Sequence, residues 1–166
     1  MRFLGIDPGL RITGYGCVCP GRGRAEAVLV EAGVFRLAGA GRRESVPDRL
    51  LELEGDVSEL IARLKPEAVA VEALFAHYKH PATAIAMGHA RGVILLAIRR
   101  AGLSLVELKP NEVKKFLTGN GHASKEQMQE AVKDRLGLRA APEPPDVADA
   151  IAIAMCAASR MTAGTR

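Results

Sequence analysis

A short run of apolar residues in the middle of the chain limits the folds that this sequence can adopt. Residues 68–71 read AVAV, four small or β-branched apolar residues in succession, and the run ends on a carboxylate, Glu72. Continuous apolarity over so few residues is typical of a strand that is covered on both faces of its sheet. We therefore expect a layered α/β fold in which helices pack on both faces of a sheet that contains this strand.

Other short runs predict the rest of the sheet and its helices. Strands are predicted over residues 2–7, 13–19, 25–37, 67–72 and 103–108. Helices are predicted over 45–64, 81–100, 111–117, 124–136 and 146–158. The order βββαβαβ, followed by further helices, predicts a mixed sheet. A crossover helix between the first and fourth strands makes them plausible parallel neighbours.

Length and composition favour one domain in a soluble, cytoplasmic protein. The chain has 166 residues, of which 48% are hydrophobic and 25% are charged, which suits a buried core and argues against disorder. We expect residues 1–158 to form this domain and 159–166 to form a flexible C-terminal tail. His89 and Arg91 make the helix 81–100 a poor membrane span, and an aspartate follows the N-terminus too soon for a secretory signal.

Four acidic residues are placed where they can meet. Asp7 and Glu72 end two strands that we expect to be neighbours, and ligands of such sheets bind beyond the carboxyl ends of the strands. Asp146 and Asp149 share one face at the start of the last helix. Carboxylates ~4 Å apart repel by roughly 4 kcal/mol per pair at an effective dielectric of 20, which favours a bound cation. Oxygen ligands without His or Cys suit Mg²⁺ or Mn²⁺, and two such ions can drive phosphodiester hydrolysis.

Each acid also has an ordinary structural interpretation. Asp7, Pro8 and Gly9 together make a favourable turn in which the aspartate bonds to the local backbone. Asp146 as the N-cap with Asp149 three residues later is nearly a capping box, and acids favour that end of a helix. Capping and metal binding do not exclude one another, so both interpretations stay open at this point.

Five segments in order resemble the successive motifs of the RuvC family of Holliday-junction resolvases. They read GIDPGLRITGYG, AVAVEALF, HARGV, GNGHASK and DVADAIAIA, and the resemblance runs from residue 2 to about 158 without large gaps. It implies an RNase H-like nuclease domain and a homodimer. It also implies a metal-dependent endodeoxyribonuclease that resolves four-way junctions by symmetric paired nicks in homologous recombination and DNA repair. The product ends would be a 5′-phosphate and a 3′-hydroxyl that ligase can seal.

The resemblance also assigns roles to the acids. Asp7, Glu72, Asp146 and Asp149 match the catalytic, metal-binding acids of the family, although some members carry His at the position of Asp146. Two Mg²⁺ ions per active site are implied, with Mn²⁺ able to substitute. The branch-migration motor formed by RuvA and RuvB is implied as a partner.

Aromatic and basic residues supply candidate DNA contacts. Phe75, which follows Glu72 closely, is expected either to stack on an unpaired base or to anchor the core. Arg91 is expected either to form a buried pair or to face DNA. Lysines of amphipathic helices usually lie on the solvated face, but Lys114 and Lys125 match lysines of the family. The full set of candidates is Phe75, Tyr78, Lys79, Arg91, Lys114, Lys115, His122 and Lys125.

The helix predicted over 81–100 suggests an oligomer. It is apolar nearly all round and contains several small residues, so it needs burial on more than the side that faces the sheet. A symmetric dimer would supply that burial and would match the two-fold symmetry of a four-way junction.

Three other functions remain as alternatives. An actin-like ATPase or sugar kinase shares the Asp-x-Gly opening, but 166 residues leave no room for its two lobes. A ribonuclease H or another nuclease of the same fold is the second, because fold alone does not determine the substrate. A protein that binds junctions without cutting them is the third, and the four acids argue against it.

Overall fold

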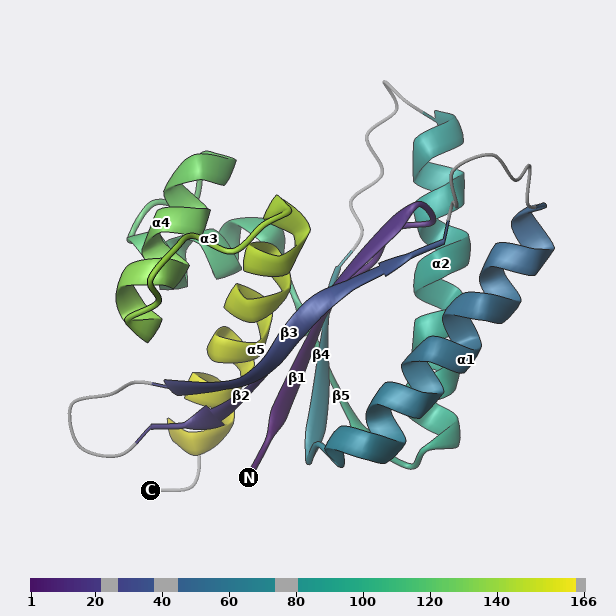
Figure 1. The fold of residues 1–166 in the computed structure, drawn as a ribbon, viewed down its shortest axis with the longest axis horizontal. Helices are drawn as coiled ribbons and strands as arrows, with labels where there is room; N and C mark the ends of the chain where they lie inside the picture. Colours follow the sequence, from purple (N-terminus) through teal and green to yellow (C-terminus); the bar gives the residue numbers. More distant parts are fainter. Residues whose placement is uncertain (22–26, 38–44, 74–80, 164–166) are drawn as a thin grey trace.

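A five-stranded sheet forms the centre of the molecule. The computed structural model describes residues 1–21, 27–37, 45–73 and 81–163 (Figure 1). The strands are β1 (Phe3–Asp7), β2 (Ile12–Pro20), β3 (Ala27–Arg36), β4 (Ala68–Glu72) and β5 (Ser104–Leu108). The helices are α1 (Val46–Leu64), α2 (Pro81–Arg100), α3 (Pro110–Thr118), α4 (Lys125–Leu136) and α5 (Pro145–Ala163).

The order of strands across the sheet is β3-β2-β1-β4-β5. β1 pairs with β2, and β2 with β3, in antiparallel orientation, whereas β1 pairs with β4, and β4 with β5, in parallel. The predicted mixed sheet and the parallel pairing of the first and fourth strands are therefore confirmed. Because Ile6 lies opposite Val71, the next residue of each strand, Asp7 and Glu72, lies at the same edge of the sheet.

Helices cover both faces of this sheet, as the apolar run of β4 predicted. Figure 1 shows α1 and α2 on one face and α5 on the other, with α3 and α4 packed outside α5. Successive side chains of a strand point to opposite faces. Val69 and Val71 of β4 accordingly pack with α1 and α2, whereas Ala68 and Ala70 pack with α5. The fold is of the α/β, RNase H-like type.

Glycines let α5 lie directly on the backbones of β1 and β2. A Cβ atom on Gly5 would lie 2.2 Å from the carbonyl oxygen of Ala150, and one on Gly14 would lie 2.1 Å from the carbonyl oxygen of Asp146. Real Cβ atoms do not approach backbone so closely, so only glycine fits at these two positions. The main chain of the sheet thus determines how near the start of α5 comes to the end of β1.

The last helix is longer than the sequence suggested. α5 continues to Ala163, so residues 159–163, which we expected in a flexible tail, form its last turn. Residues 164–166 lie outside the described residues. The helix keeps its inner face on the sheet up to Ala158, which is buried, and the residues beyond are mostly exposed.

Length and composition alone would allow α2 to cross a membrane, although His89 and Arg91 led us to expect otherwise. The packing of Arg91 shows how the helix is attached to the rest of the molecule. Its guanidinium donates to the carbonyl oxygen of Glu72 at 3.1 Å and pairs with the carboxylate of Glu107 on β5. One side of α2 is therefore anchored to the sheet by polar contacts.

Candidate active site

The turn after β1 is held without the carboxylate of Asp7. The hydroxyl of Thr13 donates to the carbonyl oxygen of Gly9 at 2.5 Å and accepts from the amide of Gly9 at 3.2 Å. Thr13 is fully buried. The carboxylate of Asp7 makes no hydrogen bond or ion pair with any other described residue, so the turn interpretation does not account for it. The bracing role of Thr13 was not predicted, because nothing in the local sequence separates it from other strand threonines.

The acids of α5 do not cap that helix. α5 begins at Pro145, so Asp146 lies inside the first turn and is not the N-cap residue. The first backbone bond runs from the amide of Val147 to the carbonyl oxygen of Pro144, at 2.9 Å. Over the part of the chain that is described, neither Asp146 nor Asp149 accepts a hydrogen bond. Both carboxylates remain available to a ligand.

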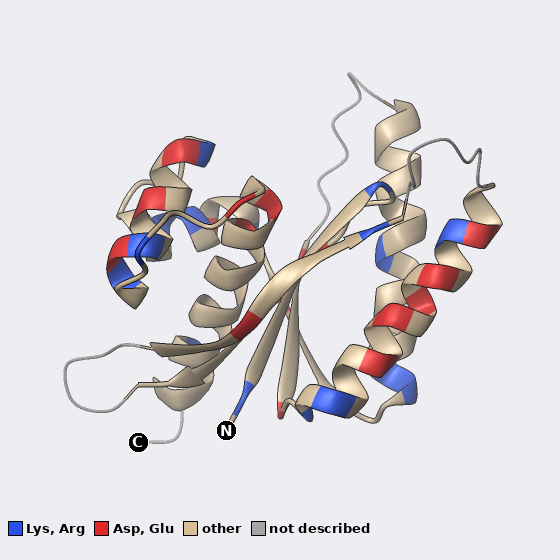
Figure 2. Ribbon diagram, viewed as in Figure 1, with Lys and Arg blue, Asp and Glu red and all other residues tan. Residues whose placement is uncertain are grey.

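Burial and neighbouring negative charge raise the pKa of three of the acids: Asp7, Glu72 and Asp149. Burial, followed by the charges of Glu72, Asp149 and Asp146, raises the pKa of Asp7 well above its ordinary value. Burial and the charge of Asp149 raise the pKa of Glu72 to about 7. Burial likewise raises the pKa of Asp149. Figure 2 shows acidic residues at the start of α5, at the end of the molecule where β1 and β4 finish.

Two lysines oppose this accumulation of negative charge. The charge of Lys125, the first residue of α4, offsets part of the rise in the pKa of Asp7, Glu72 and Asp149. The charge of Lys114 of α3 does the same for Glu72 and Asp149. The helices α3 and α4 therefore bring basic groups to the acids from outside α5. Among the predicted DNA contacts that the structure describes, only Lys114 and Lys125 lie near enough to the four acids to affect their pKa values.

Three of the other predicted contacts, Lys115, His122 and Arg91, lie in the described part of the chain. Lys115 and His122 are exposed to solvent on α3 and in the loop before α4. The guanidinium of Arg91 forms an ion pair with Glu107, whose side chain is half-exposed. Phe75, Tyr78 and Lys79 lie outside the described residues.

The four carboxylates are better suited to bind a hard cation than to pair with any described group of this chain. The carboxylates of Asp7, Glu72, Asp146 and Asp149 are partly buried and have no partner among the residues described, and oxygen ligands of this kind suit Mg²⁺ or Mn²⁺. In this conformation no three acidic, His or Cys side chains of the described segments are close enough to hold one ion. Binding would therefore need the side chains to turn towards one another.

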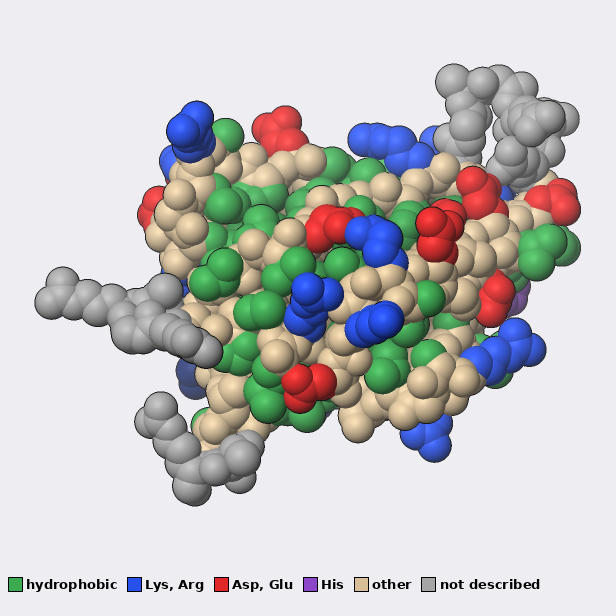
Figure 3. Space-filling model, turned by 60° about the horizontal axis from the view of Figure 1, so that its bottom comes forward, with side chains coloured by type: hydrophobic (Ala, Val, Ile, Leu, Met, Phe, Trp, Pro, Cys, Tyr) green, Lys and Arg blue, Asp and Glu red, His purple; other side chains and the backbone are tan. Residues whose placement is uncertain are grey.

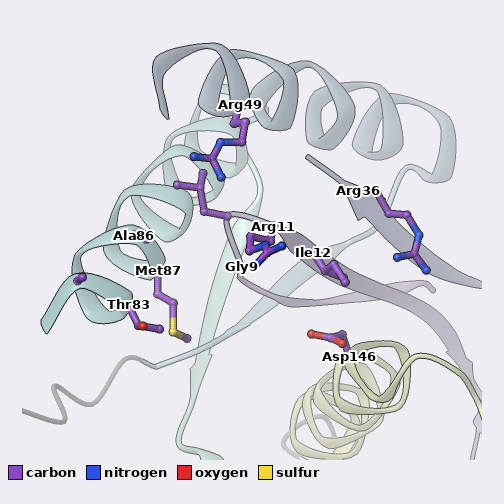
Figure 4. Close-up of a pocket in the computed structure, with 11 residues that line it drawn as sticks. Gly9, Arg11, Ile12, Arg36, Arg49, Thr83, Ala86, Met87 and Asp146 are labelled. Atoms are coloured by element: carbon purple, nitrogen blue, oxygen red, sulfur yellow. The ribbon is translucent and has the colours of Figure 1, made fainter. Parts of the chain in front are cut away.

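An open pocket of about 780 Å³ adjoins the acids at Asp146. Figure 4 shows that its walls come from the turn after β1, the end of β3 and the helices α1, α2 and α5. Three arginines line it: Arg11, Arg36 and Arg49. None of them was predicted as a site residue, because they are far apart in the sequence and only the fold brings them to one pocket.

Metal-free protein is expected to become less stable as the pH rises from about 4.5 to about 7. The folded-state pKa of Glu72 is raised from 4.5 to about 7, so in this interval the folded chain binds more protons than the unfolded chain. Stability then falls as pH increases. Melting curves in EDTA across this interval test the expectation, with Glu72→Gln as the comparison. The variant should show a weaker decline, and identical pH profiles for the two proteins would contradict the assignment.

The chain is similar to known nucleases over nearly its whole length. The model of the family "Crossover junction endodeoxyribonuclease RuvC" matches residues 3–157. A crossover junction endodeoxyribonuclease RuvC of Rhodopirellula baltica is 48% identical over 154 residues, covering 93% of this chain and 84% of the relative.

Solved structures agree with this match. Thermus thermophilus RuvC superposes with a TM-score of 0.86 at 37% identity, covering 99% of this chain and 98% of that one. The same enzyme in complex with a Holliday junction substrate gives a TM-score of 0.87 at 36% identity, covering 99% and 97%. With a family match over nearly its whole length, a relative that is almost half identical and the same fold, this chain belongs to the RuvC family of crossover junction endodeoxyribonucleases.

Proposed function

We propose that this protein resolves four-way DNA junctions by symmetric paired nicks and that the reaction depends on a divalent metal. The observation that carries the proposal is the group of four partly buried carboxylates at the carboxyl edge of the sheet, in a chain of this family. The products would be 5′-phosphate and 3′-hydroxyl ends. Such a reaction serves homologous recombination and DNA repair in the cytoplasm.

In this proposal the acids bind the metal and the lysines bind the phosphate. Asp7, Glu72, Asp146 and Asp149 would hold Mg²⁺ as a pair of ions, since four carboxylates offer ligands for two, and Mn²⁺ would be accepted by the same oxygens. When bound, these ions supply an activated water and stabilise the leaving oxygen. Lys114 and Lys125 would attract the phosphate to the acids and offset its charge.

Further DNA contacts are proposed outside this centre. Lys115 and His122 are exposed on the side of α3 and α4, where they can meet phosphates. Phe75, Tyr78 and Lys79 follow β4 in the sequence, after the strand end that carries Glu72, and Phe75 would stack on a base at the junction centre. Arg91 would act by fixing α2 to the end of β4 through its bond to the Glu72 carbonyl oxygen, and to β5 through its pair with Glu107.

The first experiment compares three substrates. Purified protein with Mg²⁺ is offered a four-way junction, a linear duplex of the same sequence and an RNA–DNA hybrid. We expect paired nicks in the junction and little cutting of the others. Preferential cutting of the hybrid would favour a ribonuclease H activity, and binding without any nicking would favour a scaffold. Calorimetry with ATP separates the remaining alternative, because an ATPase would bind the nucleotide.

We also propose a homodimer formed through α2. Ile85 and Leu96 are 60% and 49% exposed, and a Cβ on Gly88 or Gly92 would have no neighbour within 4 Å. These four residues share one face by helical spacing, opposite the buried Ile94. An uncovered apolar face with close-approach glycines suits packing against a second copy of the same helix. The RuvA and RuvB motor remains a partner proposed from family membership.

Replacing both Ile85 and Leu96 by glutamate is expected to yield monomers. Burying two carboxylates in an apolar contact is far more costly than leaving them in water. Light scattering at micromolar concentration should report about twice the chain mass of 17.6 kDa for the parent and about one chain mass for the variant. Leu51→Glu is the matched control, because Leu51 is 73% exposed on α1. A parent protein that stays monomeric even with junction DNA would refute the dimer.

A further inference from the structure

We propose that Arg11, Arg36 and Arg49 form a phosphate-binding subsite for the nucleic-acid strand, distinct from the carboxylate centre. The proposal rests on the proposed function, because it assumes that the substrate is a polyanion whose reacting phosphate lies at the acids. The ligand is a phosphodiester group of the same strand, next to the bond that is cut.

The three arginines come from separate elements, and main-chain bonds hold two of them, Arg11 and Arg36, side by side. Arg11 lies in the turn after β1, Arg36 ends β3, and Arg49 lies in the first turn of α1. Arg36 pairs in register with Ile12, the neighbour of Arg11. The amide of Leu37 donates to the carbonyl oxygen of Arg11 at 3.0 Å. The positions of Arg11 and Arg36 are therefore fixed relative to one another by main-chain bonds.

These three arginines lack the acidic partner that several other arginines of the described chain have. Four other arginines each pair with a glutamate: Arg63, Arg91, Arg100 and Arg160. Arg11, Arg36 and Arg49 make no ion pair with any residue that the structure describes. In addition, the Nε atom of Arg49 is buried without a hydrogen-bond partner. A buried donor of this kind is costly unless something accepts from it. No described group of the chain therefore satisfies Arg49 fully, and the residue lines the pocket.

The rest of the pocket favours a phosphodiester as the ligand. Leu10 and Met87 contribute apolar walls, and Asp146 is the one acid among the described residues that line it. Asp146 also belongs to the carboxylate centre, so the pocket and the centre are continuous. A strand whose reacting phosphate lies at the acids would place a neighbouring phosphate among the arginines, where guanidinium groups offer paired donors to its oxygens. Figure 4 shows Arg49 and Asp146 on opposite sides of this space, with Arg11 between them.

A different face of the molecule carries a more even distribution of charge. Figure 3, which brings the bottom of the view in Figure 1 forward, shows basic and acidic side chains interspersed on that face. A mixed surface attracts a polyanion weakly compared with a pocket whose charge is mainly positive. The arginine pocket is therefore the better place for a second phosphate.

The salt dependence of DNA binding tests the subsite, because it reports how many phosphates the protein neutralises. Junction affinity is measured in EDTA, so that no cutting occurs, over a series of salt concentrations. Removing the interaction with one phosphate should make the slope of log K against log salt shallower by about 0.7–0.9. We expect this full change when Arg36→Gln and Arg49→Gln are combined, a smaller change in the same direction for Arg49→Gln alone, and a retained slope for Arg49→Lys. Melting temperatures establish that each variant is folded.

A matched control lies on the same helix. Arg63 is near the far end of α1, about 21 Å from Arg49 along the helix axis at 1.5 Å per residue, and pairs with Glu31. Arg63→Gln removes the same charge and should leave the slope unchanged. Equal slopes for the parent and Arg49→Gln, or an equally shallow slope in Arg63→Gln, would overturn the subsite. A parent that binds DNA with these slopes but does not nick junctions in Mg²⁺ would refute the proposed function alone, whereas a parent that binds no DNA would refute both.

Discussion

Asp7→Asn is expected to abolish Mg²⁺-dependent nicking of four-way junctions while leaving junction binding largely intact. The substitution removes one negative ligand from the carboxylate centre but none of the basic groups on which binding depends. Nicking is measured on a labelled junction, and binding is measured in EDTA. If Asp7 served only the turn after β1, asparagine would replace it well, and the variant would cut at nearly the parental rate.

The same variant should show a thermal signature that a failure to fold cannot imitate. Without metal, Asp7→Asn should melt at the parental temperature or higher, because one of several repelling charges is gone. The group that is replaced is one whose pKa is raised by burial and by its acidic neighbours. With millimolar Mg²⁺ the parent should gain stability by mass action and the variant should gain less. An equal gain in both proteins would mean that the ion binds elsewhere.

Gly14→Ala is expected to reduce nicking by roughly 10²-fold, because displacements of about 1 Å have effects of that size on catalysis. A Cβ at this position would lie 2.1 Å from the carbonyl oxygen of Asp146, so the start of α5 must move away from β2. Asp146 and Asp149 then shift relative to Asp7, which lies on the neighbouring strand. The forced contact should also cost about 1–3 kcal/mol of stability.

Gly55→Ala provides the control for this prediction. A Cβ on Gly55, in the middle of α1, has no neighbour within 4 Å, and alanine in a helix interior is more favourable than glycine by about 0.5–1 kcal/mol. Junction nicking measured well below the melting transition separates a displaced acid group from simple unfolding. Parental activity in Gly14→Ala would show that α5 does not set the position of the acids.

The features that the sequence predicted correctly are those that depend on local pattern. The apolar run of β4 predicted a strand covered on both faces, and the strand order predicted that Asp7 and Glu72 would end adjacent parallel strands. Periodicity located the helices, but it placed the end of the last one at 158 because the solvated turn up to Ala163 lacks the apolar pattern. Whether Asp146 caps the last helix could not be predicted from residue type. The answer depends on where the helical backbone begins, which is at Pro145.

Features that arise only from tertiary contact were not predicted. Gly14 reads as an ordinary glycine of a hairpin strand until α5 is placed against it. The hydroxyl of Thr13 bonds to the backbone of Gly9 in the turn, but the sequence does not distinguish this threonine from any other threonine in a strand. Arg36 and Arg49 stand at the two ends of a segment that includes residues outside the described part of the chain, and no spacing rule connects them to Arg11.

The direct seating of α5 on the glycines of β1 and β2 bears on how this chain can change over evolutionary time. In most layered proteins the gap between helix and sheet is filled by side chains, so each exchange of a core residue alters the gap. Here the gap near the acids is set by main-chain atoms, whose dimensions do not vary with the sequence. Apolar positions in the layer formed by α1 and α2 can therefore change, or be redesigned for greater thermal tolerance, without altering how α5 lies on the sheet. Arg91, which ties α2 to the end of β4, is an exception.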